Sequence, residues 1–525
     1  MLGATMEFGI PFIIECVLTF FCAFLTTALF YLYVNSPFKY WKKLGVPHVK
    51  VNNFLFGDFW ENFWLSQPKL HEKTYNDFPN ERYVGIFSGT SFRKPALLLR
   101  DPDLVEAVLV RDFSYLSARG LTDNPNGSPV AKHLLNLGGE HWKVMRNKLT
   151  PTFSSGKLKG MHSQLVDCAD SLLHYMKEFE DGKPFEARDV ITRFTIDVIA
   201  SCAFGLNLDT IKNPENDFRR MALGIFKPSR RMKMIMFLRG AAPWLLPLLK
   251  IQVNKSVKKN FFVDAVEGTL EYRKQNNVVR QDFLHLTNEL KLKDLEMIKN
   301  NEMDPNDPYI FDHHSLLSNA FVFFIAGFET TASTLSNTMY ELAVNPEVQD
   351  CLLKEVKQVL EKYDGQPCYS AVQDMVYLEQ VISETLRKYP PLSSLSRKVV
   401  KEYRIPGSDL VLSEGSIVEI PVHMLHHDPQ YYPEPEKFRP ERFANGKDAI
   451  RKGTYVPFGG GPRVCIGERF AKLEAKLCLA MIINKYEIIK CDKTAAQLEF
   501  DPNAILLAPK GGIWVAIRPR ITLQT

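Results

Sequence analysis

A cysteine stands in a glycine-rich segment near the carboxyl end of the chain. Residues 458–467 read F-G-G-G-P-R-V-C-I-G, with Cys465 in the eighth place, and a helical pattern follows from Glu468 to Ile483. Three glycines and a proline do not form a helix interior, so they predict a tight loop. The backbone amides of such a loop and the amino end of the following helix favour a thiolate. The pattern predicts a reactive or metal-bound cysteine; the alternative is a surface loop with an inert thiol.

A carboxylate and a hydroxyl stand side by side in a second, largely apolar segment. Its helical pattern covers 311–346 and contains Glu329 and Thr330 in the middle. Burying these groups is costly unless something polar faces them, and Gly327 would leave room for a flat cofactor. The alternative is a threonine whose hydroxyl bonds back to its own helix.

Several arginines lie at positions where they could meet carboxylates. Glu384 and Arg387 are three residues apart on one helix face, which alone would also fit an exposed ion pair. Trp142 and Arg146 are four residues apart, and Arg397 follows a pair of prolines. The guanidinium fork binds a carboxylate through two hydrogen bonds, although each arginine alone is equally compatible with an ordinary surface position.

Together these segments resemble the cytochrome P-450 family. The haem loop of that family reads F-x-x-G-x-R-x-C-x-G, and 458–467 match every fixed position. Its distal helix carries [AG]-G-x-[DE]-T-[TS], which 326–331 match, and its E-x-x-R pair is joined by an arginine from P-E-R-F, found here at 440–443. The resemblance covers essentially the whole chain. It implies the P-450 fold, which is mainly α with a minor β portion, and haem b as the cofactor.

The resemblance also implies a role for each residue. Cys465 would be the axial thiolate and so the metal ligand, and Glu329 with Thr330 would deliver protons to dioxygen as the catalytic pair. The haem propionates and ring would be contacted by Trp142, Arg146, Arg397, Phe458 and Arg463. A structural triad would stabilise the core near the haem: Glu384, Arg387 and Arg442.

Within the family, the sequence most resembles insect microsomal enzymes that metabolise xenobiotics. This resemblance is carried by residues 148–157, by 321–325 and by the glutamate at 329, while Ala118 departs from a pattern that often has an acid or amide there. The implied activity is insertion of one oxygen atom from O2 into a lipophilic molecule, a xenobiotic or an endogenous lipid-like compound. The alternatives are a haem-thiolate isomerase or dehydratase that needs no O2, and a non-catalytic haem sensor. The intact Glu329 and Thr330 pair favours the monooxygenase.

The resemblance implies partners and a substrate pocket as well. Electrons would come from NADPH through cytochrome P-450 reductase, with cytochrome b5 as a second donor. A basic docking face could be formed by Lys143, Lys148, Lys472 and Lys476, which as single residues are equally well explained as solvated lysines. Pocket walls would come from 119–130, 218–226, 321–331, 392–395 and 503–507, which are rich in apolar residues.

The amino-terminal segment predicts a membrane anchor. The 19 residues from Cys16 to Val34 carry no charge, close to the roughly 20 that cross a bilayer. Lysines at 39, 42 and 43 follow the span, which places the body in the cytosol. The resemblance to microsomal enzymes implies that the membrane is that of the endoplasmic reticulum. There are three alternatives. A cleaved signal peptide would have a shorter apolar region, and a mitochondrial presequence would be rich in arginine. A buried core helix would leave the basic flank unexplained. The predicted division is an anchor at 1–36, a basic and proline-containing linker at 37–50 and a monooxygenase domain at 51–525.

The remaining pattern predicts the elements that carry these residues. Strands are expected at 83–87, 95–99, 416–422 and 512–517, and helices over most of 102–390. The segment 244–249 is apolar with basic residues before it, so it either enters the membrane interface or connects two buried helices.

Composition excludes several other classes of protein. The chain has 525 residues, 45% hydrophobic and 24% charged, with a net charge of +5 that is spread along its length. Without dense basic blocks, nucleic acid is not an expected partner. Nine cysteines, an odd number without a C-x-x-C pair, indicate neither a disulfide framework nor a zinc site.

Overall fold

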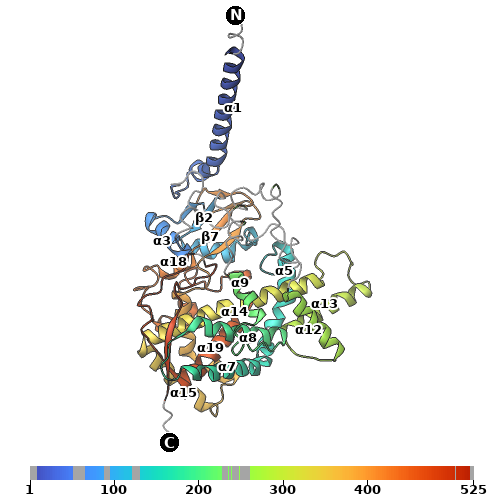
Figure 1. The fold of residues 1–525 in the computed structure, drawn as a ribbon, viewed down its shortest axis with the longest axis vertical. Coiled ribbons are helices and arrows are strands. Elements are labelled where there is room, and N and C mark those ends of the chain that lie inside the picture. Colours follow the sequence, from blue (N-terminus) through green and yellow to red (C-terminus); the bar gives the residue numbers. More distant parts are fainter. Residues whose placement is uncertain are drawn as a thin grey trace, which may run out of the picture.

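The protein is mainly helical with small sheets, as the sequence predicts. Its structure is a computed structural model that describes residues 9–50, 65–87, 95–120, 130–226, 235, 238, 248, 261–502 and 504–520. Figure 1 shows helix α1 (Gly9–Asn35) standing away from one end of the body, beside a small sheet, with the helices forming the rest. Of the apolar segment 244–249, all but residue 248 lies outside the described residues.

The helices of the body fall along the chain in three groups. The first group is α2 (Tyr40–Lys43), α3 (Gln67–Asp77), α4 (Pro102–Glu106), α5 (Gly139–Leu149), α6 (Ser155–Gly160) and α7 (His162–Met176). The second is α8 (Ala187–Ile199), α9 (Asp217–Phe226), α12 (Phe261–Gln275), α13 (Phe283–Lys299) and α14 (His313–Val344). The third is α15 (Pro346–Lys362), α16 (Tyr369–Asp374), α17 (Val376–Lys388), α18 (Val422–His427) and α19 (Glu468–Lys485).

The largest sheet lies next to the base of α1 (Figure 1). Its strand order is β1-β2-β7-β4, with β2 and β7 parallel and the other two pairs antiparallel. The strands are β1 (Tyr83–Ile86), β2 (Ala96–Leu99), β7 (Ile417–Ile420) and β4 (Leu395–Lys398). A second sheet joins β3 (Phe185–Glu186), β9 (Trp514–Pro519) and β8 (Tyr486–Ile489), and a third joins β5 (Tyr403–Arg404) to β6 (Val411–Leu412). The four strands expected from sequence are confirmed as β1, β2, β7 and β9; the others are additions.

Helix α14 is the central element of the core. The carboxylate of Asp312 caps its first turn by accepting a hydrogen bond from the backbone N–H of Ser315 at 2.7 Å, and Pro346 follows its end. Among the residues whose side chains the structure describes, it is the one helix long and apolar enough to cross a membrane, yet most of it is buried inside the body; the described side chains of α1 cover the shorter apolar stretch Ile14–Leu29. It packs against α8, α17 and α19, so it is a core helix that carries Glu329 and Thr330 through the interior.

The segment expected as a linker is packed onto the body. Trp41 is 1% exposed, and its indole N–H donates to the carbonyl of Ile86 at 3.1 Å. The N–H of Gly85 donates to Pro47 at 2.7 Å, and the N–H of Val49 donates to Gly85 at 3.0 Å, so residues 47–49 run beside β1. Residues 38–49 are thus held against the edge of the large sheet rather than forming a free connection.

Candidate haem-thiolate site

The cysteine loop joins the short 3-10 turn Gly461–Arg463 to the amino end of α19. The backbone N–H of Cys465 donates to the carbonyl of Phe458 at 2.9 Å, which closes the loop. Gly461 has φ +64°, and a Cβ there would overlap the carbonyl of Leu109, so this turn requires glycine. The Cys465 side chain remains exposed in this chain.

The electrostatics of Cys465 combine opposing effects. Desolvation by the surrounding protein raises the pKa of its thiol, while a hydrogen bond from the backbone N–H of Gly467 and the nearby Arg119 and Arg146 lower it. The cationic groups therefore favour the thiolate, whereas the protein atoms packed around the accessible sulfur disfavour it. A metal cation bound at the sulfur would remove the remaining penalty.

Four arginines from distant segments gather near this loop. Arg463 is 2% exposed; its Nη2 donates to the carbonyl of Leu137 at 2.6 Å, and its guanidinium lies 4.4 Å from the centre of a ring of Trp142. Arg146 donates to the carbonyl of Val464 at 2.9 Å. The structure thus brings together Arg146 and Trp142 of α5 with Arg463 of the loop, as expected for a joint site.

The other two arginines are Arg119 and Arg397. Arg119 donates to the carbonyl of Arg463 at 3.3 Å, and Arg397 of β4 is 2% exposed and donates to the carbonyl of Ser396 at 2.9 Å. The Nε atoms of Arg119, Arg397 and Arg463, and also Nη1 of Arg463, are buried without a hydrogen-bond partner. Among the residues that the structure describes, no carboxylate forms an ion pair with any of the four.

Like-charge crowding adds to burial at these arginines. Burial, followed by the charges of Arg119, Arg397 and Arg146, lowers the pKa of Arg463 to about 8. Burial and the charge of Arg119 lower the pKa of Arg397 to about 9. Buried cations and unused N–H donors of this kind are costly unless an anion accompanies them. The cluster therefore fits a ligand with more than one carboxylate.

The face of α14 that carries Thr330 is accessible. Ala326 is exposed and Thr330 is half-buried, one helical turn apart. The Thr330 hydroxyl donates to the carbonyl of Ala326 at 2.8 Å, which is the back-bonded arrangement. Its oxygen lone pairs can still accept a hydrogen bond.

Glu329 points elsewhere. It is 4% exposed and forms an ion pair with Arg188 at the start of α8, whose side chain is 20% exposed. The two adjacent residues Glu329 and Thr330 therefore lie on different faces of α14. The expectation that Gly327 leaves room for a cofactor is wrong, because a Cβ at this glycine would lie 2.7 Å from Cδ1 of Ile199; the glycine permits close packing of α14 on α8.

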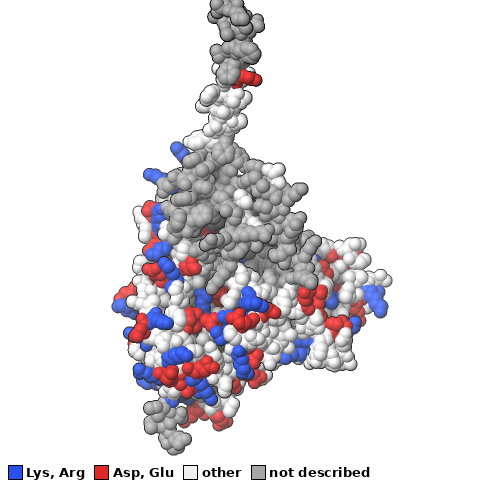
Figure 2. All heavy atoms as spheres, viewed as in Figure 1, with Lys and Arg blue, Asp and Glu red and all other residues white. Residues whose placement is uncertain are grey.

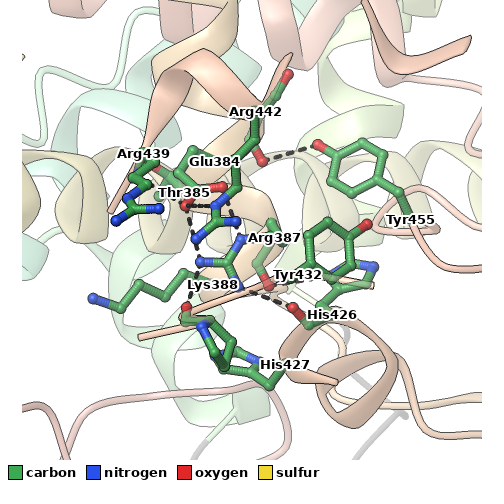
Figure 3. A network of polar contacts seen from close by, with 12 residues as sticks. Glu384, Thr385, Arg387, Lys388, His426, His427, Tyr432, Arg439, Arg442 and Tyr455 are labelled. Carbon is green, nitrogen blue, oxygen red and sulfur yellow. Dashed lines mark hydrogen bonds and ion pairs between the residues drawn. The ribbon is translucent and has the colours of Figure 1, made fainter. Parts of the chain in front are cut away.

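The triad residues are joined in a buried network (Figure 3). Glu384 and Arg387, both fully buried, share two hydrogen bonds of 2.8 and 2.9 Å. Arg442 donates to the same carboxylate at 3.3 Å and to the carbonyls of Pro433 and Glu434. The network connects α17 to the segment that leads into the cysteine loop.

Comparison with known proteins identifies the family. The profile described as Cytochrome P450 matches residues 53–516. The chain belongs to the cytochrome P450 family. It is 37% identical to "Cytochrome P450 6a2" of Drosophila melanogaster over 95% of this chain and 99% of that protein. It is also 35% identical to "Cytochrome P450 6k1" of Blattella germanica, over 92% and 93%, and 34% identical to "Cytochrome P450 6B2" of Helicoverpa armigera, over 93% and 96%.

The P450 family supplies the group that the site requires. Its members are haem-thiolate monooxygenases, and haem carries an iron for a thiolate and two propionates for arginines. The exposed Cys465 sulfur and the unpaired arginine cluster provide both kinds of contact within one region. The residues present therefore fit haem.

One feature of this P450 differs from what the sequence suggests. Arg119 was expected only as part of a pocket wall, yet it belongs to the arginine cluster. The sequence signal that could have identified it is an arginine without a neighbouring acidic residue in the segment 117–120, S-A-R-G. The lysine docking face stays a prediction, and one of its four lysines, Lys143, is largely exposed, at 63% of its side chain. Lys148 pairs with Asp294, Lys472 pairs with Glu379 and Glu468, and Lys476 is 4% exposed. Acidic and basic side chains are intermingled on the visible face of the body (Figure 2).

Proposed function

We propose that this P450 inserts one oxygen atom from O2 into a lipophilic small molecule, using electrons from NADPH delivered by cytochrome P450 reductase. The observation that carries the proposal is the Cys465 sulfur presented beside an arginine cluster that has no acidic partner among the described residues. When bound, haem supplies the iron that activates dioxygen. Cys465 would ligate that iron. Arg119, Arg146, Arg397 and Arg463 would bind the propionates, and Trp142 and Phe458 would pack beside them.

Thr330 and Glu329 have separate tasks in this proposal. The Thr330 hydroxyl lies on the accessible face of α14, where it holds a water molecule near the reacting oxygen. Glu329 lies behind it, and its ion pair with the partly exposed Arg188 links the buried carboxylate to the surface. Glu329 therefore passes protons inward from the side of α8. A haem-thiolate isomerase would have no use for this arrangement.

A lipophilic substrate fits the accessible apolar side chains of two segments that are bonded to α14. Leu392 is 42% exposed and Ile505 is 53% exposed. The backbone N–H of Leu507 donates to the carbonyl of Pro391 at 2.9 Å, and the carbonyl of Leu507 accepts from Ser333 of α14 at 3.5 Å. These bonds bring the two apolar segments to α14. Apolar surface near the reacting position favours an uncharged, lipophilic molecule.

Helix α1 is the membrane anchor in this proposal. Its 27 residues measure about 40 Å, and large apolar side chains from Ile14 to Leu29 are exposed. The hydroxyls of Thr19, Thr26 and Thr27 bond to carbonyls one turn earlier, so they need no water. Residues 1–36 then form a single-pass anchor in the endoplasmic reticulum membrane, and 51–525 form the cytosolic catalytic domain with 37–50 docked on it. Deleting 1–36 should release the body from membranes with its haem spectrum intact.

The test of haem ligation is the spectrum of the reduced protein with carbon monoxide. Thiolate-ligated haem should give a strongly red-shifted Soret band, and Cys465→Ala should abolish it. Cys478→Ala, in the helix α19 that follows the loop, is the control: Cys478 is fully buried, and the variant should keep the band. An unchanged spectrum in Cys465→Ala would overturn the proposal. A normal spectrum without NADPH consumption in the presence of reductase and lipophilic substrates would instead indicate an isomerase or a sensor.

A further inference from the structure

His426 is a fully buried residue outside the haem-contacting set. It is the penultimate residue of α18 and lies between the Glu384–Arg387 pair and the start of the cysteine loop (Figure 3). Its ring stacks on Tyr455 with centroids 5.3 Å apart, and the Tyr455 hydroxyl donates to the carbonyl of Ser383 in α17 at 3.0 Å. The His426 ring therefore contacts Tyr455, in the segment that leads into the cysteine loop, and Tyr455 is in turn bonded to α17.

Both ring nitrogens of His426 are used. The carbonyl of Arg387 lies 3.1 Å from Nδ1 and can only accept, so Nδ1 carries the proton. The backbone N–H of Val456 donates to Nε2 at 3.0 Å, so Nε2 is unprotonated. In return, Nη1 of Arg387 donates to the carbonyl of His426 at 2.9 Å. These three bonds require one neutral tautomer.

Val456 is the residue from which the cysteine loop departs. Its carbonyl accepts from the N–H of Gly459 at 2.9 Å, and two residues after it the carbonyl of Phe458 accepts from the N–H of Cys465, also at 2.9 Å. The ring of His426 connects Arg387 to Val456, and the backbone hydrogen bonds of the loop connect the segment that begins at Val456 to Cys465. The Nε2 acceptor of His426 is therefore the side-chain group that holds the start of the loop.

We propose that His426 is a positioning residue: its neutral ring fixes the start of the cysteine loop relative to the Glu384–Arg387 pair and so holds the Cys465 sulfur where haem iron binds. This inference rests on the proposed role of Cys465 as the thiolate ligand. Burial lowers the pKa of His426 to about 3, so the acceptor at Nε2 is retained at neutral pH.

Two substitutions separate the two hydrogen bonds of the ring. His426→Gln places a carbonyl oxygen near the position of Nε2, so the acceptor for Val456 can be retained. His426→Asn can still donate to the carbonyl of Arg387 but is too short to reach Val456. His427→Gln is the matched control, because Nδ1 of His427 bonds to the carbonyl of His423 within the same helix, at 2.7 Å.

The readout is the reduced carbon monoxide spectrum of the full-length protein, with thermal unfolding as the measure of folding. A buried N–H without an acceptor should shift the balance between thiolate and neutral-thiol ligation by about tenfold in His426→Asn. His426→Gln should recover most of the thiolate band, and His427→Gln should match the wild type. A folded His426→Asn protein with the wild-type spectrum would overturn the inference, as would equal losses in the Asn and Gln variants.

A second variant covers the case in which His426→Asn does not fold. Val456→Pro removes the N–H that Nε2 accepts, and Pro457 already restricts residue 456 to extended backbone. Because the buried isopropyl group of Val456 is lost as well, Val456→Ala, which keeps the N–H, is its control and should keep the thiolate band. Val456→Pro should show the neutral-thiol band, and a wild-type spectrum of this variant would contradict the inference. The wild-type protein separates the two proposals: absence of its thiolate band refutes the role of Cys465, whereas its presence leaves only the role of His426 under test.

Discussion

Replacing Gly85 by alanine should push a methyl group into the indole of Trp41. A Cβ built on Gly85 would lie 2.6 Å from both Cδ1 and Cδ2 of Trp41, far inside van der Waals contact. The indole cannot retreat easily, because it is 1% exposed and its N–H is bonded to the carbonyl of Ile86. The contact between residues 38–49 and the sheet therefore depends on this glycine.

The packing around Trp41 and Gly85 sets the expected loss of folding free energy in each variant. Overpacking a filled site typically costs about 1–3 kcal/mol, which is the expected effect of Gly85→Ala. Truncating a buried tryptophan costs about 3–5 kcal/mol, which is the expected effect of Trp41→Ala. In the double variant the new methyl group enters space that the indole has left. The two costs should then fail to add, with a coupling of about 1–3 kcal/mol.

Hydrogen exchange of the full-length protein in bilayer discs measures the loss of local stability at this contact. The N–H groups of Val46, Val49 and Gly85 donate to the carbonyls of Trp41, Gly85 and Pro47, respectively, so their exchange reports opening of the docked segment. Each 1.4 kcal/mol of lost local stability should speed their exchange about tenfold.

A control and a refuting outcome complete this experiment. Gly268→Ala in α12 has nothing within 4 Å of the new methyl group and should leave these amides unchanged. If the effects of Gly85→Ala and Trp41→Ala add in the double variant, the steric account of Gly85 is wrong.

Three further predictions concern the site, and a fourth concerns His423 of α18. Thr330→Ala should keep haem binding but lower the ratio of product to released peroxide about tenfold or more, because the hydroxyl that orders water is lost; equal coupling would assign the water to another group. Arg188→Gln should leave the carbon monoxide spectrum unchanged while slowing turnover and raising its solvent isotope effect, since the ion-pair partner of Glu329 is removed; an unaltered isotope effect would exclude this route. Glu384→Gln should cost about 3–5 kcal/mol by leaving a buried arginine uncompensated, seen as a lower unfolding temperature and less haem-loaded protein. Burial lowers the pKa of His423 from 6.5 to about 3, so between these pH values the unfolded chain binds the extra proton, and stability falls on acidification by up to about 1.4 kcal/mol per pH unit; His423→Gln should reduce that slope in pH-dependent unfolding.

The sequence predicted the local features of this site well. Glycines and a proline ahead of Cys465 required a loop, and Gly461 indeed adopts a left-handed backbone against Leu109. The spacing of Glu384 and Arg387 placed them on one face of α17. Such predictions succeed because the residues involved are neighbours along one helix or one turn, where backbone geometry alone sets their relation.

Contacts between distant segments were not predictable in the same way. Arg188 and Glu329 are 141 residues apart, and nothing in the helical pattern of α14 says which side chain of α8 meets the carboxylate. For Gly327 the missing side chain in an apolar helix suggested room for a cofactor, while the neighbour in its Cβ direction is Ile199. The exposure of the lysines near the haem segments was not predictable for a related reason: whether Lys148 is free depends on Asp294, which only the fold brings to it.

The large sheet determines how the anchor relates to the arginine cluster. Trp41 docks on β1, and unbroken ladders connect β1 to β2, β7 and β4, where Arg397 lies. Because β1 is an edge strand, opening the Trp41 contact leaves the β2-β7-β4 ladders intact. Release of α1 from the body should therefore be separable from loss of the arginine cluster, and we expect the Trp41–Gly85 contact, rather than the site itself, to set how the body is oriented relative to the proposed anchor.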